Sequence, residues 1–461
     1  MTIEEILNSG QQPEAIMGML KEKAENVPSW GKLVREYDPT KHPVMDRAKY
    51  PDISLGGGKV DYVTRITYDL QSLAVKRMTE LCFGIPVKRI YKPDENDKKQ
   101  QEVAKYMEAI FQRNRIDAVN IDRGRRLFAS CETMTLWYSV EDRNKLYGFD
   151  SPIKLRCQTY SPMQGDRLFP LFDETGDLVA LSVEYRRKSV NKQVTFFDCY
   201  TADRHIRWST TNNGWAVDVD ERHNIGKIPG IYISRPTPIW EDTSRIVEEM
   251  EWSMSRNGNY LRKNSKPLFA VFADETIAFG QEKPENEEAR SVLQFPAGSN
   301  ANYITWSQAI DNLKFYISEL RQSFFTQLQL PDWSYESMKA NPMSGESRKQ
   351  LFIDAQLKVK DESGRWLEAF DREVNVVKAF LKQALSGYDD AIDSLQVEVA
   401  ITPYTITDEA DTIRNLVTAN GGKPLISQRQ GVAQLGWSDD VDQTMKELQA
   451  ESMADALQGA M

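Results

Sequence analysis

Two long helical patterns in the chain are separated by the loop-like segment PDWSYESMKANPMSGES, residues 331–347. Before it, apolar residues recur every three or four positions from Ile310 to Leu328, which predicts a helix. After it, Ser344 or Ser347 can cap a second helix of about forty residues. A tight turn would suffice to join two helices. A Pro-bounded loop of this length therefore indicates a segment with a role of its own.

The helix expected after this loop carries apolar residues from Leu351 through Trp366 to Leu381. The polar run Asp361, Glu362, Ser363 and Gly364 falls midway and is expected to interrupt it. Since sharp helix bends occur at glycine and serine pairs, this run predicts a kink near Gly364.

The rest of the chain alternates between helical and strand-like patterns. Two short helices are expected in residues 1–35, split at Gln12 and Pro13, then a loop-like region over 41–60. Helical spacing predicts a helix within 61–84 and two more from residue 98, the last turning strand-like near residue 140. Residues 151–234 predict an antiparallel β-meander, because short β-branched and aromatic runs alternate with turn signals such as DETGD and TNNG.

The second half repeats this mixture. A helix is expected from Asp242, Thr243 or Ser244 to about residue 264. Three short strands, PLFAVF, SVLQFP and NYITWS, should follow, with the charged run GQEKPENEEAR between the first two. A strand in SLQVEVAITPY and two small helices around the linker GGKPLISQRQ end the sequence. The expected fold class is α+β.

The composition of the chain excludes several classes of protein. The 461 residues contain no run of eighteen apolar residues, and the acidic start lacks the zones of a signal peptide, so a soluble intracellular protein is expected. Cys82, Cys131, Cys157 and Cys199 form no CxxC pair and are expected to be buried free thiols. The three histidines are too far apart for a metal motif, so no cofactor or metal is expected. A net charge of −10 argues against a tight grip on DNA, which normally needs a basic excess.

No sequence motif indicates catalysis. The run Gly56, Gly57, Gly58 and Lys59 resembles a phosphate-binding loop, but Ile53 and Val60 stand where that motif needs glycine and a hydroxyl residue. Neither GxSxG nor HExxH occurs, and the carboxylate-rich runs read as solvated faces. A structural protein is the first hypothesis. The alternative that stays open is a metal-dependent nuclease, built from carboxylates that converge only in the fold, or another enzyme that acts on nucleic acid.

The order of these elements resembles the portal proteins, or head-to-tail connectors, of tailed double-stranded DNA bacteriophages, especially the long-tailed siphovirus type. Five collinear segments carry the resemblance: VKRMTELCFGIPVKRIY, TYSPMQGDRLFPLFDETGDLVALSVEYRR, RHNIGKIPGIYISR, LPDWSYESMKANPMSGESRKQLF and KPLISQRQGVAQLGWSDDVDQTMKELQAE. The likeness covers the chain from about Tyr62 onward. The short tail and the brief ENEEAR excursion depart from it, which implies a small crown and a compact clip.

This resemblance implies a definite anatomy. A mixed α/β wing would span 1–240 and 349–400, the latter being the long kinked helix. Two stem helices would occupy 241–266 and 309–330, with a small α/β clip at 267–308 between them. The tunnel loop would be 331–348, and 401–461 would form a small helical crown.

The resemblance also implies a function. A homo-oligomeric ring of about twelve subunits, at one capsid vertex of the virion and in the host cytoplasm during assembly, would form the channel for DNA packaging and ejection. Expected partners are double-stranded DNA, the terminase large subunit, a head-completion or adaptor protein, and the major capsid and scaffolding proteins; no membrane is involved. The tunnel-loop residues nearest the DNA would be Met338, Lys339, Asn341 and Met343. The clip residues that dock partners would be Glu282, Lys283, Glu285, Glu287, Glu288 and Arg290.

Overall fold

In the computed structural model, the described residues are 3–22, 27–189, 192–212, 214–264, 268–272, 300–304, 310–334, 350, 352–404, 409–421, 424–438 and 440–458. The chain divides into two compact units, each assembled from separated segments. Unit 1 contains Met1–Val27, Val75–Pro236 and Gln329–Met461, and unit 2 contains Pro28–Ala74 and Thr237–Leu328. Helices and antiparallel strands both occur in each unit, which confirms the α+β class.

Unit 1 is built around two antiparallel sheets. The three-stranded sheet has the order β11 (Gly230–Ser234), β4 (Glu132–Asn144), β5 (Ser151–Tyr160). The five-stranded sheet runs β10-β9-β8-β7-β6, from β6 (Arg167–Phe172) through β7 (Leu178–Ser189), β8 (Lys192–Tyr200) and β9 (Arg204–Thr211) to β10 (Gly214–Arg222). Neighbours in sequence are neighbours in this sheet, so the β-meander predicted over 151–234 is confirmed for β6 to β10, whereas β5 and β11 at its two ends belong to the three-stranded sheet.

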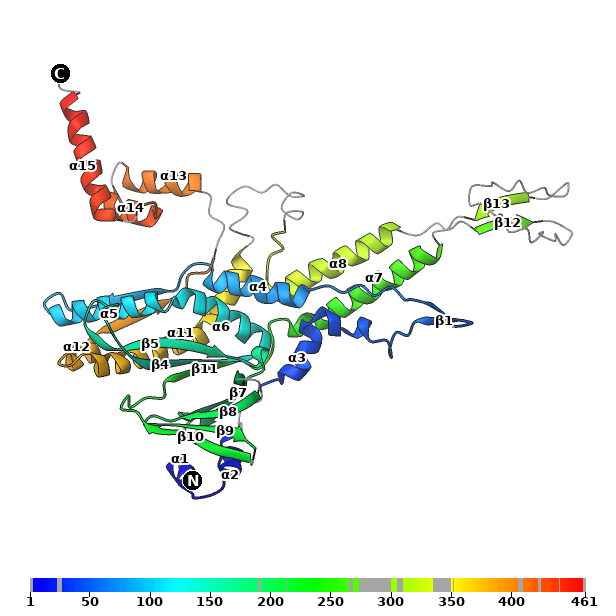
Figure 1. Ribbon diagram of the computed structural model, residues 1–461. Coiled ribbons are helices and arrows are strands. Elements are labelled where there is room, and N and C mark those ends of the chain that lie inside the picture. The colour runs from blue at the N-terminus through cyan, green and yellow to red at the C-terminus, as the bar shows by residue number, and fades with distance from the viewer. Residues whose placement is uncertain are drawn as a thin grey trace. The chain divides into compact units, whose positions relative to one another are not determined.

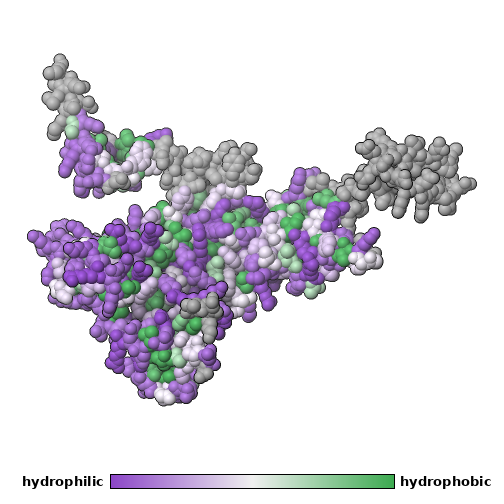
Figure 2. Space-filling view, in the orientation of Figure 1, coloured by the Kyte–Doolittle hydropathy of each residue, from purple (hydrophilic) through white to green (hydrophobic). Residues whose placement is uncertain are grey.

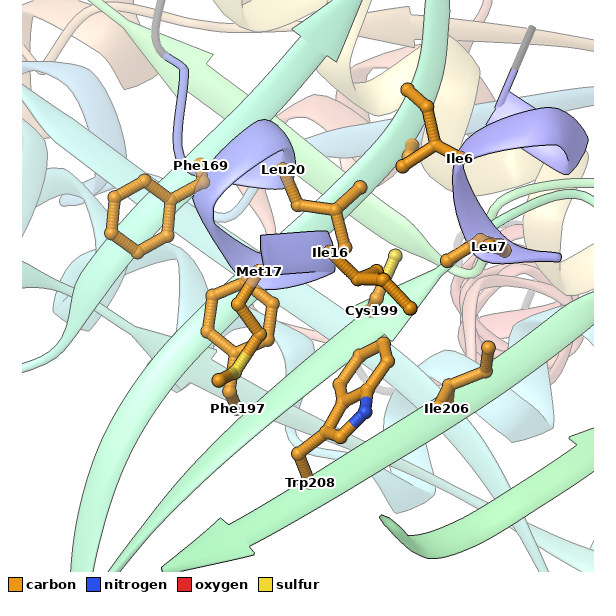
Figure 3. Packing of buried hydrophobic residues seen from close by; sticks show 11 residues of the cluster. Ile6, Leu7, Ile16, Met17, Leu20, Phe169, Phe197, Cys199, Ile206 and Trp208 are labelled. Atoms are coloured by element: carbon orange, nitrogen blue, oxygen red, sulfur yellow. The ribbon is translucent and has the colours of Figure 1, made fainter. Parts of the chain in front are cut away.

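Helices cover the outer faces of both sheets (Figure 1). The three-stranded sheet packs against α6 (Ile116–Ser130) and the long helix α11 (Ile353–Ala384). The two sheets bury a shared cluster that includes Met134 of β4, Tyr160 of β5 and Leu181 of β7. On the far side, α1 (Ile3–Leu7) and α2 (Pro13–Leu20) set Ile16, Met17 and Leu20 against a sheet face that includes Phe197 and Trp208 (Figure 3). Each such large apolar side chain contributes about 1.5–3 kcal/mol of burial energy.

The remaining elements of unit 1 complete the framework. Helix α4 (Leu70–Phe83) begins in unit 2 and ends in unit 1, and α5 (Lys98–Arg113) precedes α6. Strand β3 (Lys88–Lys92) pairs with β14 (Gln396–Ala400), beyond α12 (Asp389–Ser394). Three helices end the described chain: α13 (Glu409–Asn420), α14 (Gln428–Leu435) and α15 (Val441–Gln458).

Unit 2 is centred on two helices, α7 (Ser244–Asn264) and α8 (Ile310–Leu328), which contact each other. Helix α3 (Trp30–Tyr37) and the 3-10 turns η1 (Pro39–Lys41), η2 (Pro43–Met45) and η4 (Glu241–Thr243) complete its helical part. It also contains two hairpins, β1 (Ile53–Gly56) with β2 (Lys59–Asp61), and β12 (Leu268–Phe272) with β13 (Asn300–Ile304).

Several sequence predictions need correction. The helix expected within 61–84 begins only at Leu70, and residues 62–69 are extended. The region 41–60 is not only loop: Gly57 and Gly58, with φ of 58° and 77°, form the tight turn of the β1–β2 hairpin. The expected linker GGKPLISQRQ contains the start of a third tail helix, α14. There Ser427 and Gln430 form a capping box, in which the side chain of each residue accepts a hydrogen bond from the backbone N–H of the other.

The long helix is confirmed, and α11 continues unbroken through Gly364, so the polar run does not interrupt it. A bend of its axis there stays a prediction. The proposed caps Ser344 and Ser347, Leu351 and the expected strand at 291–296 lie outside the described residues. No helix among the described residues is long and apolar enough to cross a membrane.

Candidate functional site

The predicted DNA-facing and partner-docking residues lie outside the described part of the chain. These are Met338, Lys339, Asn341 and Met343 of the loop, and Glu282, Lys283, Glu285, Glu287, Glu288 and Arg290 of the clip. Gly364 is described; no atom within 4 Å would meet a Cβ added to it. What the structure does show is the packing of the residues that flank these segments in each unit.

The two ends of the candidate tunnel loop are joined by an aromatic stack in unit 1. The ring of Trp333, before the loop, lies 5.2 Å from that of Phe352, after it, with an interplanar angle of 13°. The guanidinium of Arg77, on α4, sits 4.1 Å from the centre of the Trp333 ring. Phe352 and Leu330 are both buried. Trp333 and Phe352, which flank the candidate tunnel loop, are therefore held together on one packed base.

The long helix α11 is anchored to the three-stranded sheet by a buried ion pair. Both carboxylate oxygens of Glu373 accept hydrogen bonds from Arg123 of α6, each at 3.0 Å, and the Trp137 indole of β4 donates a third at 3.0 Å. Glu373 is only 1% exposed. Burial opposes the charge of Glu373, but Arg123 outweighs that effect and lowers the pKa of the carboxyl. The pair therefore stays ionised and fixes α11 in place.

A second anchor lies nearer the start of α11. Arg235, at the end of β11, donates to Glu362 of α11 at 2.9 Å, and both side chains are largely buried. Near it, Trp366 of α11 packs edge-on against Phe83 of α4, with ring centres 4.9 Å apart. Both flanks of Gly364 are thus held by packed neighbours, although the glycine itself is exposed.

In unit 2, an extended segment is fastened along α7 by a ladder of hydrogen bonds. The backbone N–H groups of Thr64, Ile66 and Tyr68 donate to side chains of Asn259, Ser255 and Glu251, at 2.5, 2.9 and 2.8 Å. Alternate residues of an extended chain thus meet residues one turn apart on a helix. Because these side chains satisfy the backbone, residues 62–69 need no helix of their own, which explains where the sequence prediction went wrong.

Gly258 permits this close approach. A Cβ at that position would lie 2.9 Å from Cγ2 of Thr64, closer than two carbon atoms can sit. The start of the segment is fixed by Arg65, whose guanidinium donates to Asp52 at 2.9 Å and to the carbonyl of Tyr50 at 2.6 Å. Segment 62–68, called the strap below, is thereby held at both ends.

His42 meets α7 at Glu251, the same residue that accepts from Tyr68. Its Nδ1 lies 2.7 Å from a carboxylate oxygen of Glu251, and its Nε2 lies 2.7 Å from the carbonyl oxygen of Glu36. Since an ionised carboxylate and a carbonyl only accept hydrogen bonds, both ring nitrogens must donate, and the ring carries a positive charge. Burial alone would lower the pKa of His42, but the hydrogen bond and charge of Glu251 outweigh it and raise the pKa.

Glu36 extends this network to the start of α7. Its carboxylate accepts hydrogen bonds from the indole of Trp240 at 3.0 Å and from the hydroxyl of Ser244 at 2.6 Å. Strap, α3 and α7 therefore share one buried polar network. A network whose members are all paired rigidifies the elements that it joins.

The helix pair itself presents apolar surface. The Tyr316 hydroxyl of α8 donates to Glu249 of α7 at 3.1 Å, while Phe324, Leu328 and Met250 are buried. Phe315 is 67% exposed, and Leu261 and Tyr316 are also exposed. Figure 2 shows hydrophobic patches on this pair among polar ones. Exposed aromatic and aliphatic side chains of this size are typical of surfaces that meet another protein.

The chemistry of the described side chains is that of packing and pairing. The thiols Cys82, Cys131 and Cys199 are buried and all four cysteines are free. Burial raises the pKa of Cys157 and of Cys199 to about 12, so little thiolate forms at neutral pH. Among the described residues, no group of three or more His, Cys, Asp or Glu side chains could hold a metal ion.

The sequence did not single out His42, Arg77, Glu251 or Glu373 as framework residues. Glu373 and Arg123 are 250 positions apart, and His42 and Glu251 are 209 apart. No short-range spacing signals such pairs. Only the scarcity of histidine, with three in the chain, could have drawn attention to His42.

In unit 1 two sheets are anchored to a long helix, and in unit 2 a helix pair is held by the strap. Such arrangements are typical of a structural protein, whose elements keep fixed positions. The family model "Phage portal protein, SPP1 Gp6-like" matches residues 32–456. The chain therefore belongs to this family of structural phage proteins, and the resemblance seen in the sequence is confirmed.

Solved structures with a similar course of the chain come from gene transfer agent (GTA) particles. The neck of the empty particle, computed with C6 symmetry, is 11% identical with a TM-score of 0.43. The neck of the native particle, with C12 symmetry, is 11% identical with a TM-score of 0.40, and the virion of the native particle is 10% identical with a TM-score of 0.40. Each alignment covers 92% of this chain and 98% of the other. No curated protein matches the chain.

Proposed function

We propose that this protein is the portal subunit of a tailed bacteriophage, and that about twelve copies form a ring at one capsid vertex of the virion. The family match over residues 32–456 carries this proposal. Double-stranded DNA would pass through the ring during packaging and ejection. The ring assembles in the host cytoplasm with scaffolding and major capsid proteins, and acts as a structural channel, not as an enzyme.

Charge supports a conduit that does not bind DNA tightly. Duplex DNA carries one negative charge per about 1.7 Å of its axis, and a basic lining would hold it by counterion release. One chain has a net charge of −10, so a ring of about twelve would carry about −120. Repulsion from such a ring keeps DNA centred and free to move.

In this proposal α7 and α8 are the stem helices, within the predicted ranges 241–266 and 309–330. The wing keeps its predicted ranges, 1–240 and 349–400, and the crown is 401–461. The clip, 267–308, would dock the terminase large subunit during filling and the head-completion or adaptor protein afterwards. Its acidic run would steer these partners toward the clip and let one replace the other, more than it would raise their affinity.

The tunnel loop, 331–348, would reach the DNA from the base made by Trp333, Phe352 and Arg77. Met338, Asn341 and Met343 offer soft or polar contacts, and Lys339 gives each subunit one positive charge near phosphate. Because Trp333 and Phe352 stack, the loop is closed at its base, and changes in the loop should leave the fold intact.

Negative-stain electron microscopy of the purified chain tests the ring. Rings with a central hole support the proposal, whereas monomers with magnesium-dependent cleavage of DNA would favour the nuclease. Deleting 339–343 should leave rings intact yet lower the amount of DNA packaged, and a Gly-Ser replacement of equal length controls for loop length. Normal packaging by the deletion ring would count against the loop assignment.

The clip assignment has its own test. Reversing the charge of Glu285, Glu287 and Glu288 to lysine should reduce packaging or tail attachment while rings still form. Glu174→Lys, at an exposed turn between β6 and β7, is the matched control for charge reversal. Unchanged packaging and tail attachment would remove the support for partner docking at this run.

A further inference from the structure

The charged residues of the five-stranded sheet in unit 1 are sorted by the end of the sheet at which they lie. One end holds the β6–β7 turn, the β8–β9 turn and the last residues of β10, which pair with the first residues of β9. Six acids occur there: Asp173, Glu174, Asp177, Asp203, Asp220 and Glu221. At the opposite end, residues 185–197 and 208–217 contain four cations and no acid. Since the chain has 68 acids in 461 residues, about three would be expected in these 23 positions.

The cations at this opposite end lie on both faces of the sheet. Arg186, Arg187 and Lys188 are exposed near the end of β7, and their register partners on β8 are neutral. Because successive side chains of a strand point to opposite faces, Arg186 and Lys188 share one face and Arg187 lies on the other. Beside Arg186 in the register is Thr195, whose backbone N–H donates to the hydroxyl of Thr210 on β9 at 3.0 Å. These five residues are called the basic end below.

The acid next to the basic end on the same strand is already neutralised. Glu184, two residues before Arg186, pairs with Lys21 of the α2 C-terminus at 2.6 Å and with Arg167 of β6 at 3.3 Å. Two cations thus share this one carboxylate, which leaves none of its charge for the basic end.

Other acids nearby are also engaged elsewhere. Glu14 of α2 accepts from the backbone N–H of Trp215 at 3.2 Å, and Asp166 acts on Arg187 only through space. Arg187 itself donates to the neutral amide of Gln158 at 3.3 Å. Among the described residues, no acid forms an ion pair with any of the three cations of the basic end. Three positive charges are therefore open to an anion from outside the chain.

We propose that the basic end binds the phosphate backbone of double-stranded DNA without reading its sequence. Phosphates are contacted by arginine and lysine together with neutral donors such as threonine, which is the composition of this surface. Interfaces between proteins are instead depleted in lysine, so an acidic protein is the less suitable partner.

The charge of the rest of the chain limits this contact. With a net charge of −10, the protein holds DNA only locally and weakly, and the acidic end of the sheet repels it. The sheet therefore meets DNA by its basic end. The choice of DNA as the available polyanion rests on the proposed function, but the contact itself needs no ring.

The salt dependence of DNA binding tests the proposal. Fluorescence anisotropy gives the affinity of the purified full chain for a short labelled duplex, measured over a fourfold rise in salt from about 20 mM. Each phosphate contact contributes about 0.9 to the slope of log affinity against log salt, so three contacts weaken binding about forty-fold over this range. The triple variant Arg186→Gln, Arg187→Gln and Lys188→Gln should lose this dependence. The variant Arg186→Lys with Arg187→Lys keeps the charges and should keep the slope.

A matched control removes three exposed cations elsewhere in unit 1. Lys98→Gln, Lys105→Gln and Arg113→Gln on α5 change the net charge by the same amount and should leave the slope nearly unaltered. Equal effects of the two triple variants, an unchanged slope in the basic-end variant, or no binding by the unaltered chain at low salt would overturn the proposal. Competition by poly-glutamate as strong as that by unlabelled DNA, at equal charge, would also overturn it, because the site would then take an acidic peptide.

Imaging of the same preparations separates this inference from the proposed function. Rings that lack the salt-dependent binding would overturn only the basic end as a DNA contact. Binding by a chain that forms no rings would leave the basic end standing and remove the proposed function.

Discussion

Glu373→Gln should be among the most destabilising single changes in unit 1. The substitution keeps the size of the side chain but removes the only carboxylate among the described residues that pairs with Arg123, at two contacts of 3.0 Å. A glutamine also turns an NH₂ group toward a guanidinium that can only donate. Removing one partner of a buried pair leaves an uncompensated charge, which costs about 3–5 kcal/mol.

Denaturant unfolding followed by tryptophan fluorescence measures this loss, since the Trp137 indole donates to the same carboxylate. Glu368→Gln is the matched control: it lies on the same helix, its side chain is 65% exposed, and its partner is Arg372 one turn away. A change of less than about 1 kcal/mol is expected there. If Glu373→Gln cost no more than this control, the buried pair would not anchor α11.

A double variant and a pH series sharpen the test. Arg123→Met with Glu373→Leu should recover part of the loss, because a packed apolar pair needs no counter-charge, while the buried Arg89 of β3, 4.0 Å from Glu373, still loses its carboxylate. The pKa of Glu373 is lowered, so its contribution is fully present above the ordinary pKa of a glutamate and is lost as the pH falls through the lower folded value. The Glu373→Gln protein should lack that acid-side loss.

Four further predictions concern the His42 pair, the loop base, the strap and α11. Because the pKa of His42 is raised, its pair with Glu251 stabilises unit 2 fully below about pH 6.5. This stabilisation is lost as the pH rises through the folded pKa, so the free energy of unfolding should fall there. In the His42→Gln protein this fall should be smaller. Trp333→Ala should destabilise the loop base by about 1–3 kcal/mol and speed hydrogen exchange around residues 330–334, whereas the exposed Trp437→Ala should not. Gly258→Val should displace the strap and expose the Thr64, Ile66 and Tyr68 amides to exchange, while Gly364→Ala, with open space around it, should stabilise α11 by up to about 1 kcal/mol. Protected strap amides in the Gly258→Val protein would refute the close-approach argument.

The sequence was most informative where structure follows local periodicity. The meander from β6 to β10, the helix pair α7 and α8, and the long helix α11 were all predicted from spacing and turn residues. The order of these elements sufficed for the family resemblance. Such features depend on neighbours a few residues away, which the sequence displays directly.

Predictions failed where distant partners replace local ones. Ile66 fits a helical spacing, but its backbone N–H is satisfied by Ser255, 189 positions later, so the segment stays extended. The pair of Arg123 and Glu373 could not be predicted for the same reason: the partners are far apart in sequence, and arginine and glutamate occur throughout the chain. The capping box at Ser427 was a missed local signal, since Ser and Gln three positions apart are visible in the sequence.

The ladder between the strap and α7 has a mechanical consequence. Two residues of extended chain advance about 6.6 Å, and four residues of helix advance about 6.0 Å, so only a few rungs can match before the two spacings drift apart. A pull along the helix axis must break all matched rungs together, and they can form again only after a jump of a full turn. The strap can therefore shift along α7 only in steps of one helical turn, and its hydrogen bonds resist smaller displacements.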